Sequence, residues 1–342
     1  MFGRDTVLAL SAAAAFAWVA VPAAAHDFYA GKSLTIVVGN PAGSGYDAYA
    51  RLLGRHISRH IPGRPNVVVQ NMPGAGGVKA TDFIANVAPK DGTVLALTLP
   101  GALVDPLTGD PGKFRYTPER LAYVGTMDSG TRLCMTFSSS KVRSVEIART
   151  TPAVMAATQV GSSAHDYPHF LNAIVGTRFK VVTGYSGPAD LFLAAERGEA
   201  DGLCGIDIST FAALRPNWLE GRSTAHAMLQ VGLEPNPKAS ALGFPSIWQY
   251  VNAEDKSLVE LIVSQQVFQR PVIAPQTTPH AHLAILRSAF VAALNDAQLL
   301  EEARKSVLDI NPKSGEEVEA LVRKIYSAPK DLIQRMTRVI RP

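Results

Sequence analysis

The sequence predicts an α/β protein built of two lobes. Two series of apolar, β-branched runs alternate with amphipathic stretches, one within residues 34–98 and the other within residues 154–205. Strands that alternate with helices form parallel sheets with right-handed crossovers, so each series predicts one α/β unit. The chain of 342 residues is also long enough to bury two ordinary hydrophobic cores.

The composition excludes several classes of protein. Hydrophobic residues make up 47% of the chain and charged residues 18%, with 27 Gly, 23 Pro and two Cys. These values exclude a disordered tail, a collagen-like fibre and a disulfide scaffold. The formal net charge of +4 is small, and no Lys/Arg run is interleaved with aromatic residues. We therefore expect no nucleic-acid partner, whereas an anionic small molecule is compatible with the charge.

The first 25 residues have the pattern of a signal peptide. Arg4 precedes an apolar run at residues 7–21, and Ala23-Ala24-Ala25 follows it. This order is typical of a leader that is cleaved after Ala25. A membrane anchor would need about 20 apolar residues and basic flanks. We expect an exported mature chain that begins at His26, most simply in a bacterial periplasm.

In the first unit, the three expected strands are apolar runs at residues 34–39, 67–70 and 94–98. Two helices are expected between them, at residues 46–60 and 78–88. A connection rich in Pro, Gly and Thr follows at residues 99–118, and strand-like runs then occur at residues 122–126 and 133–137.

In the second unit, strands are expected at residues 154–158, 179–183 and 202–205, with helices at residues 167–175 and 189–197. The run 225–232 precedes mainly helical sequence, at residues 282–294, 297–307 and 316–325. These helices have too few strands to form a third sheet, so we expect them to pack on the first.

Two crossings between the lobes are expected, near residues 128–131 and 221–225. They divide the chain into a signal peptide (1–25), a discontinuous lobe I (26–129 and 226–342) and lobe II (130–225).

Two glycine-rich loops lie between a strand and a helix of lobe I. Their sequences are Pro41-Ala42-Gly43-Ser44-Gly45-Tyr46-Asp47 and Asn71-Met72-Pro73-Gly74-Ala75-Gly76-Gly77. Unpaired N–H groups at a helix start face the crevice at the carboxyl end of the sheet and attract anions. The candidate ligand-binding residues here are Pro41, Ala42, Gly43, Ser44, Gly45, Asp47, Asn71, Gly74, Ala75, Gly76 and Gly77.

The first loop has alternative interpretations. Residues 43–48 match the dinucleotide pattern G-x-G-x-x-[GA], but Gln70 and Asn71 stand where that motif needs an acidic residue. Lys79 lacks the context of a P-loop, which disfavours triphosphates. A strand–helix turn without any ligand remains open.

Lobe II carries a second group of candidates at the ends of its strands. Ser162 and Ser163 either cap a helix or contact the ligand. Tyr185 and Gly187 follow one strand, and Asp207 follows another, where it either selects a hydroxyl or ammonium group of the ligand or caps a helix. His165 lies beside Ser163 and Asp166, but neighbours on a first helical turn point to different faces, so a local catalytic triad is not expected.

Neither a metal nor a cofactor is expected. His56 and His60 have i,i+4 spacing, but they lie on a helix with Arg51, Arg55 and Arg59, which indicates a solvated face. The 70-residue spacing of Cys134 and Cys204 excludes a metal knuckle. In an oxidising compartment the two cysteines either pair or remain buried thiols.

The chain resembles the periplasmic substrate-binding proteins of the tripartite tricarboxylate transporters, also called Bug receptors. The matching segments include residues 28–32, 36–38, 47–51, 71–77, 91–93, 161–165, 185–187 and 198–202. The resemblance implies a type II Venus-flytrap fold that binds a small organic acid between its lobes. It also implies that the first two loops hold the ligand carboxylate through backbone amides, hydroxyls and bridging water.

The sequence departs from the family pattern at two positions. Met72 stands where the family usually has Arg, and Ser44 interrupts a segment that is often glycine-rich. Cys134 and Cys204 resemble a feature of one sub-branch, which favours a disulfide in lobe II.

The expected function is capture of a mono-, di- or tricarboxylate and its delivery to the membrane subunits of a transporter, by a monomer without catalytic activity. One alternative is an exported hydrolase-like enzyme on a carboxylate or ester, which would use a pair such as Ser44 and His165. Another is a receptor for a membrane sensor.

Overall fold

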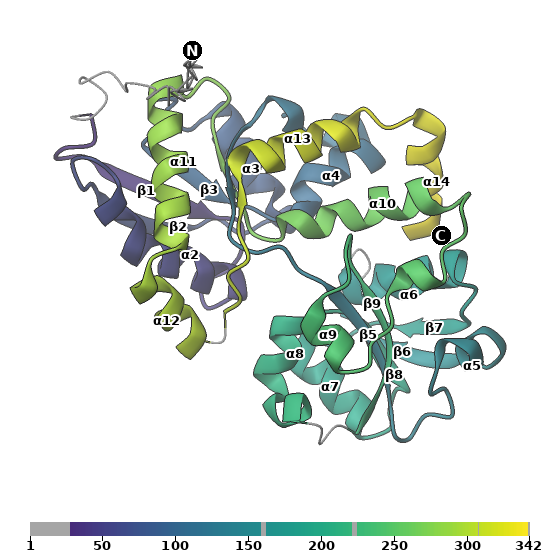
Figure 1. Cartoon of the computed structure of the whole chain (residues 1–342). Helices are drawn as coiled ribbons and strands as arrows, with labels where there is room; N and C mark the ends of the chain where they lie inside the picture. The colour runs from purple at the N-terminus through teal and green to yellow at the C-terminus, as the bar shows by residue number, and fades with distance from the viewer. Residues whose placement is uncertain (1–27, 159–161, 221–223, 307, 341–342) are drawn as a thin grey trace, which may run out of the picture.

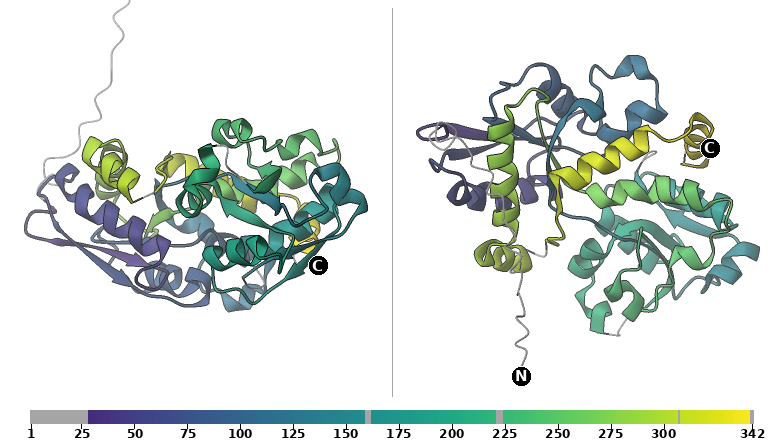
Figure 2. Two further views of the ribbon diagram at one scale, coloured as in Figure 1. Left: turned by 90° about the horizontal axis from the view of Figure 1, so that it is seen from below. Right: turned by 45° about the horizontal axis from the view of Figure 1, so that its top comes forward.

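The computed structural model describes residues 28–158, 162–220, 224–306 and 308–340 (Figure 1). The expected signal peptide and its cleavage site lie outside the described residues. The α/β fold class is confirmed, because two separate sheets are each covered by helices (Figures 1 and 2).

The first sheet has six strands in the order β11-β4-β10-β3-β1-β2. Its strands are β1 (Ser33–Val38), β2 (Asn66–Asn71), β3 (Val94–Leu97), β4 (Ala122–Thr126), β10 (Pro271–Ala274) and β11 (Lys313–Ser314). The expected parallel series is confirmed, since β1 runs parallel to β2 and β3. The late strand β10 is antiparallel to both neighbours and was not expected from the sequence.

The second sheet has five strands in the order β7-β6-β8-β5-β9. They are β5 (Arg132–Phe137), β6 (Ala153–Ala156), β7 (Phe179–Val182), β8 (Gly202–Asp207) and β9 (Ala225–Val231). The strand β6 is parallel to β7 and β8, whereas β5 is antiparallel to β8 and β9.

The position of β9 corrects one expected boundary. Residues 226–231 were expected in lobe I, but β9 pairs with β5 along its whole length, so this strand completes the second sheet. A parallel bridge between Gln230 and Ser246 keeps the following segment beside it. The chain returns to the first sheet only after that segment, through α10 (Lys256–Ser264) and β10.

Helices cover both faces of the first sheet. On one face, α2 (Gly45–Ile57), α11 (His280–Leu294) and α12 (Ala297–Lys305) pack over the alternate residues Leu34, Ile36 and Val38 of β1. On the other, α3 (Val78–Asn86), α10 and α13 (Gly315–Tyr326) pack in the core that contains Val37. Residues that alternate along a strand point to opposite faces, which explains this division.

Several helices were missed from sequence. The segment 99–118, expected as a connection, contains α4 (Pro100–Thr108), which begins with a proline at its first position and has Pro106 inside it. The helices of the second sheet are α5 (Val145–Thr150), α6 (Ser163–Ile174), α7 (Pro188–Glu196), α8 (Ile208–Leu214) and α9 (Pro237–Ala241). Of these, α6 and α7 were expected.

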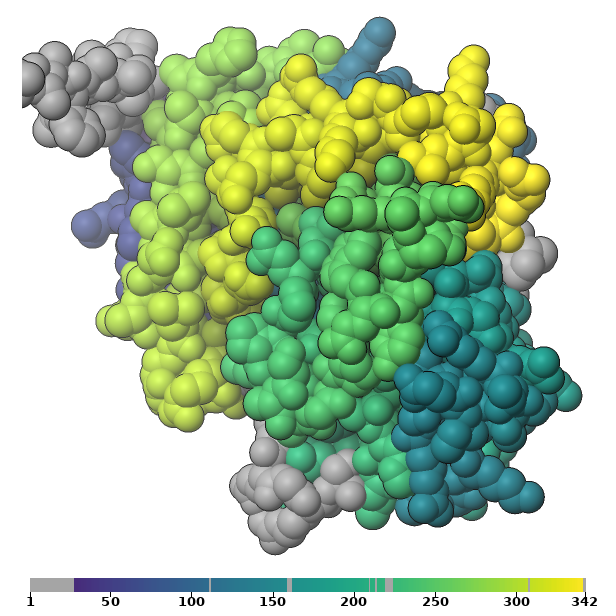
Figure 3. All heavy atoms as spheres, turned by 45° about the vertical axis from the view of Figure 1, so that its right-hand side comes forward, coloured from purple at the N-terminus to yellow at the C-terminus, as the bar shows by residue number. Residues whose placement is uncertain are grey.

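The C-terminal helix α14 (Lys330–Ile340) joins the two halves of the molecule. It packs against α4 and α10 on the side of the first sheet and against α6 on the side of the second. In the space-filling view, the yellow C-terminal segment lies above the teal and green part of the chain (Figure 3). Among the described helices, none alone has the length and apolarity needed to cross a membrane, although α11 and α12 together, bent by 59°, meet those two criteria.

Candidate functional site

A cavity of about 340 Å³ lies between the two halves of the molecule. One wall comes from α4 and the residue before it, and the opposite wall comes from the first two turns of α6 and its capping residue. The walls consist of Leu99, Pro100, Gly101, Val104, Asp105 and Thr108 on the first side and Ser162, Ser163, Asp166, Tyr167 and Phe170 on the second. The spacing of three, four and seven residues places each set on one helix face.

Further residues from several elements complete the lining of the cavity. They are Tyr46, Gly76, Arg132, Ile262, Gln265, Gln266, Gln269 and Ile340. A larger cavity of about 650 Å³ lies against α2 and β2 of the first sheet. Its described lining contains no residue of the second sheet. The 340 Å³ cavity is our candidate site, because residues of both halves line it and the predicted site residues Gly76, Ser162 and Ser163 are among them.

In the first glycine-rich loop, the carboxylate of Asp47 accepts a hydrogen bond from a backbone N–H group that was expected to bind the ligand. Gly43 N donates to Asp47 Oδ2 at 2.9 Å, and Asn71 Nδ2 donates to Asp47 Oδ1 at 2.9 Å. Arg51 Nε donates to the same carboxylate at 2.9 Å. The Arg51 hydrogen bond, with those from Gly43 and Asn71, lowers the pKa of Asp47 to about 2. At this loop the anion bound by the amide of Gly43 is thus a side chain of the protein.

The remaining residues of the first loop have structural positions. Ser44 caps α2, because its Oγ accepts a hydrogen bond from Asp47 N at 3.3 Å. Pro41, Ala42, Gly43 and Gly45 are exposed and do not belong to the described lining of the cavity. The loop therefore fixes the start of α2, and its neighbour Tyr46 reaches the cavity.

The second loop has a left-handed backbone. Gly74, Ala75, Gly76 and Gly77 have φ angles of 150°, 45°, 60° and 90°. The φ of Gly77 strains any other residue, and a side chain there would also lie 2.8 Å from Leu99 Cδ1, so glycine is favoured at this position. Gly76 alone of the predicted residues in this loop lines the cavity, whereas Asn71 donates to Asn40 O and Asp47 and thereby ties the two loops together.

The predicted serines of the second unit do reach the cavity. Ser162 and Ser163 both line it, and Ser162 also caps α6 by accepting from His165 N at 3.3 Å. His165 lies outside the described lining. Its Nδ1 contacts Asp166 Oδ1 at 2.8 Å, and its ring lies 4.7 Å from that of His169.

The other predicted residues of this unit lie away from the cavity lining. Tyr185 packs on the edge of the hydrophobic cluster around Phe192, and Gly187 caps α7. Asp207 is buried at the start of α8 and forms an ion pair with Arg132, at 2.6 Å from Oδ2 to Nη1. Asp207 therefore acts on the cavity only through Arg132.

Arg132 is the functional candidate that the sequence analysis missed. It begins β5, and its side chain lines the cavity although only 14% of it is exposed. Its Nη1 donates to Gly205 O at 3.3 Å and its Nη2 to Gln269 Oε1 at 2.5 Å. The sequence signal that could have identified Arg132 is its position as a basic residue directly after the first crossing between the sheets.

A second buried guanidinium lies beside it. Arg270 is 9% exposed and lies over the rings of Tyr46 and Tyr49, at 4.7 Å and 4.9 Å. Its Nη2 is 3.9 Å from Asp207 Oδ2, so Asp207 faces two arginines. Arginine remains charged even when it is buried.

Asp128, on the first crossing, adds a titratable group to this cluster. Burial and the neighbouring charge of Asp207 raise its pKa to about 7, against the opposing effect of Arg270. Below that pH Asp128 is mainly neutral, and two guanidiniums then face the carboxylate of Asp207. In that protonation state the buried cluster beside the cavity carries excess positive charge.

Two glutamines connect the crossings with the cavity. Gly130 N donates to Gln266 O at 3.0 Å, and Gln269 N donates to Asp128 O at 3.1 Å. The side-chain amide of Gln266 has an orientation in which both its nitrogen and its oxygen form hydrogen bonds. In it, Nε2 donates to Val231 O at 2.7 Å and Oε1 accepts from the Tyr167 hydroxyl. Burial raises the pKa of Tyr167 to about 12, so this hydroxyl keeps its proton.

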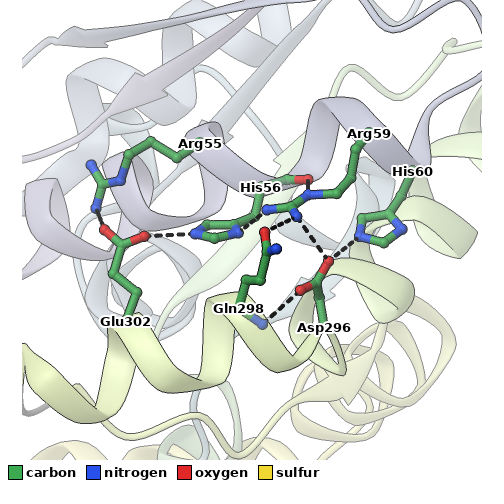
Figure 4. A network of polar contacts seen from close by, with 7 residues as sticks. All are labelled: Arg55, His56, Arg59, His60, Asp296, Gln298 and Glu302. Carbon is green, nitrogen blue, oxygen red and sulfur yellow. Dashed lines mark hydrogen bonds and ion pairs between the residues drawn. The ribbon is translucent and has the colours of Figure 1, made fainter.

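On the helix face expected to be solvated, the three arginines are exposed, but His56 and His60 pack against α12 and the residue before it (Figure 4). His56 is buried, and its Nε2 lies 2.6 Å from Glu302 Oε2. Its Nδ1 contacts the guanidinium of Arg59, which can only donate, so Nε2 carries the hydrogen and donates to Glu302. His60 pairs with Asp296 at 3.0 Å. These contacts attach α12 to α2, and no cluster able to hold a metal occurs within the described ranges.

Comparison with known proteins identifies curated relatives that match part of the chain and solved structures that match most of it. No family model matches it. It is 28% identical to protein BugT of Bordetella pertussis over 242 residues, which cover 68% of this chain and 72% of BugT. A UPF0065 protein of Pseudomonas sp. strain P51 is 36% identical over 103 residues, a match that spans only 30% of that relative.

Solved structures with the same fold include a TctC solute-binding protein from Polaromonas, with a TM-score of 0.69 and 16% identity over 90% of this chain and 99% of that chain. The chain is similar in sequence to BugT and in fold to this TctC solute-binding protein. Two proteins of Rhodopseudomonas palustris are also similar. MatC with bound malate has a TM-score of 0.60 and 20% identity over 88% of this chain and 99% of that one. A structure with adipate has a TM-score of 0.63 and 18% identity over 91% and 98%.

The chain differs in one respect from what the resemblance implied. Backbone amides of the first two loops were expected to hold the ligand, but the amide of Gly43 holds Asp47. The cationic group in the lining of the cavity is Arg132.

Proposed function

We propose that the chain is a periplasmic solute-binding protein that captures a small organic carboxylate in the 340 Å³ cavity and delivers it to a membrane transporter. The observation that carries this proposal is the guanidinium of Arg132 in the lining of a cavity built by both sheets. Such a group attracts an anion, and the surrounding walls exclude water from the contact.

The charges around the cavity support an anionic ligand. Arg132 and Arg270 face the carboxylate of Asp207, and when Asp128 is neutral a bound carboxylate would balance the second positive charge. Micromolar affinity corresponds to about −8 kcal/mol. Hydrogen bonds to charged groups contribute about 1.5–3 kcal/mol each, so contacts with Arg132 and the hydroxyls of Ser162 and Ser163, together with apolar burial, are sufficient.

We propose a corrected division into lobes that follows the strand pairing. Lobe I contains residues 26–129 and 251–342, and lobe II contains residues 130–250. The two crossings then lie at residues 127–131 and near residue 250, and rotation about them opens the cavity. Closure requires that the ligand bind the shut form more tightly than the open one. Contacts from both α4 and α6 to the same ligand would give that difference.

The proposal includes neither catalysis nor a cofactor. One protein of known structure that is similar to this chain is a TctC solute-binding protein. MatC is similar too and holds malate, and another similar protein of R. palustris holds adipate. The pair Ser44 and His165, considered for a hydrolase, is engaged elsewhere, since Ser44 caps α2 and His165 contacts Asp166. We propose a monomer in the periplasm.

A thermal-shift screen tests this proposal. The mature protein is heated with single mono-, di- and tricarboxylates, and the hits are confirmed by calorimetry and by NMR of the recovered ligand. We expect at least one acid to raise Tm and to be recovered unchanged. Arg132→Gln should weaken its binding at least tenfold. Conversion of the acid would support the enzyme instead, and the absence of binding by every carboxylate would reject the proposal.

A further inference from the structure

The charged residues in the lining of the cavity are unequally distributed. Among the residues described in the lining, Arg132 is the one basic residue, and two residues, Asp105 and Asp166, are acidic. Asp166 follows Ser163 on α6, and Asp105 lies on the opposite wall. The lining therefore provides one cationic group for a ligand carboxylate and no second one.

Arg132 lies at the end of the cavity where α6 begins. Its Nη1 donates to Gly205 O, and a side chain added at Gly205 would lie 2.3 Å from Ser163 O. Arg132, Gly205 and the first residue of α6 are thus neighbours. Phe170 is seven residues further along α6, which corresponds to about 10 Å along the helix axis.

Four apolar side chains, one of them Phe170, gather in the lining, with Asp105 and Thr108 as their polar neighbours on α4. Phe170 is almost fully buried and belongs to one hydrophobic cluster with Val104, Ile262 and Ile340. All four also line the cavity. They come from α6, α4, α10 and α14, so four helices build an apolar surface away from Arg132.

We propose that this receptor is specific for monocarboxylates with an apolar body. This inference rests on the proposed function and narrows the ligand class. The carboxylate binds beside Arg132, Ser162 and Ser163, and the apolar body lies against Phe170, Val104 and Ile340. A second carboxylate at the far end would lose its hydration against these side chains and would find no cationic partner in the lining.

Pairs of acids with equal carbon number test the inference on the unmodified protein. Hexanoate and adipate differ in whether the far end is a methyl or a carboxylate group, and 4-methylbenzoate and terephthalate differ in the same way. Calorimetry at pH 7 should show at least tenfold tighter binding of the monocarboxylate in every pair of which either acid binds. Adipate or terephthalate binding as tightly as its partner would overturn the inference but leave the proposed function intact. Failure of all carboxylates to bind would reject both.

A charge added at the far end gives a second test. Ile340→Lys places an ammonium group on α14 at the apolar end. We expect this variant to bind hexanoate more weakly and adipate at least tenfold more tightly than the unmodified protein does. Gln334→Lys adds the same charge to an exposed position of the same helix, outside the described lining. It should change neither affinity. An equal effect of both variants on adipate would show that long-range charge controls binding, which would contradict the inference.

Discussion

Arg132 Nη1 and Asp207 Oδ2 lie 2.6 Å apart, between neighbouring strands of the second sheet and beside the interlobe cavity. Both side chains are almost buried, at 14% and 9% exposed. Asp207 also faces Arg270, so removing its charge would leave two buried guanidiniums without the carboxylate that lies nearest to both.

Asp207→Ala should therefore be strongly destabilising. Breaking a buried ion pair by removing one partner costs about 3–5 kcal/mol. Urea denaturation at pH 7 measures the change in the free energy of unfolding. Glu316→Ala is the matched control, because this residue pairs with Arg287 but its side chain is 65% exposed. We expect a loss below about 1 kcal/mol there, and equal losses in the two variants would contradict the role given to Asp207.

The titration of Asp128 should make stability depend on pH. Its pKa is raised to about 7 in the folded protein, so folding favours the neutral carboxyl group. Its contribution to stability is complete below the unfolded pKa near 4 and is lost as the pH rises to 7. The difference of about three pKa units corresponds to roughly 4 kcal/mol.

Comparison of Asp128→Asn with the unmodified protein isolates this effect. The amide stays neutral, so the variant should gain stability relative to the parent between pH 5 and pH 8, as measured by urea denaturation. Asp207, Arg270, Arg132 and Asp309 face Asp128 and are present in both proteins. Parallel stability curves for the two would show that Asp128 does not titrate in this range.

Asp47→Ala should reduce stability more than it reduces binding. The carboxylate accepts hydrogen bonds from Gly43 N, Arg51 and Asn71 and thereby organises the start of α2. Losing such contacts at a helix start costs about 1–2 kcal/mol. Since the pKa of Asp47 is lowered to about 2, this stabilisation is present above pH 4 and is lost as the pH falls through 2.

The measurement is a urea curve together with the affinity for whichever carboxylate the screen identifies. Asp47→Ala should weaken binding less than Arg132→Gln does. The reverse order would indicate that the first loop, and not Arg132, dominates recognition of the ligand.

Much of the fold could be predicted from local sequence patterns. The β-branched run of β1 and the stretch of α2 with apolar residues on one face define their elements without distant information. The run of β9 was also recognised, but it was placed in the wrong lobe, because an apolar run does not specify its partner strand. The helix α4 was not predicted because its segment contains prolines, although a proline at the first helical position is compatible with a helix.

The candidate site was only partly predictable for a similar reason. Glycine-rich loops and helix caps are local features, so Gly76, Ser162 and Ser163 were found. The burial of Arg132 depends on Asp207 and Gln269, which are 75 and 137 residues away in the chain. Asp47 was assigned to the ligand because sequence cannot show that its carboxylate turns back onto Gly43.

The cysteines provide a last prediction. Cys134 on β5 and Cys204 on the adjacent strand β8 are joined by a disulfide, and both are buried. Thiol titration of the denatured, non-reduced protein should therefore detect no free thiol, and two thiols would reject the bond. A disulfide that closes a loop of this length stabilises the fold by at most roughly 4 kcal/mol. The double variant Cys134→Ala, Cys204→Ala should lose about 2–4 kcal/mol in urea denaturation while it retains ligand affinity, because neither residue belongs to the described lining of the cavity.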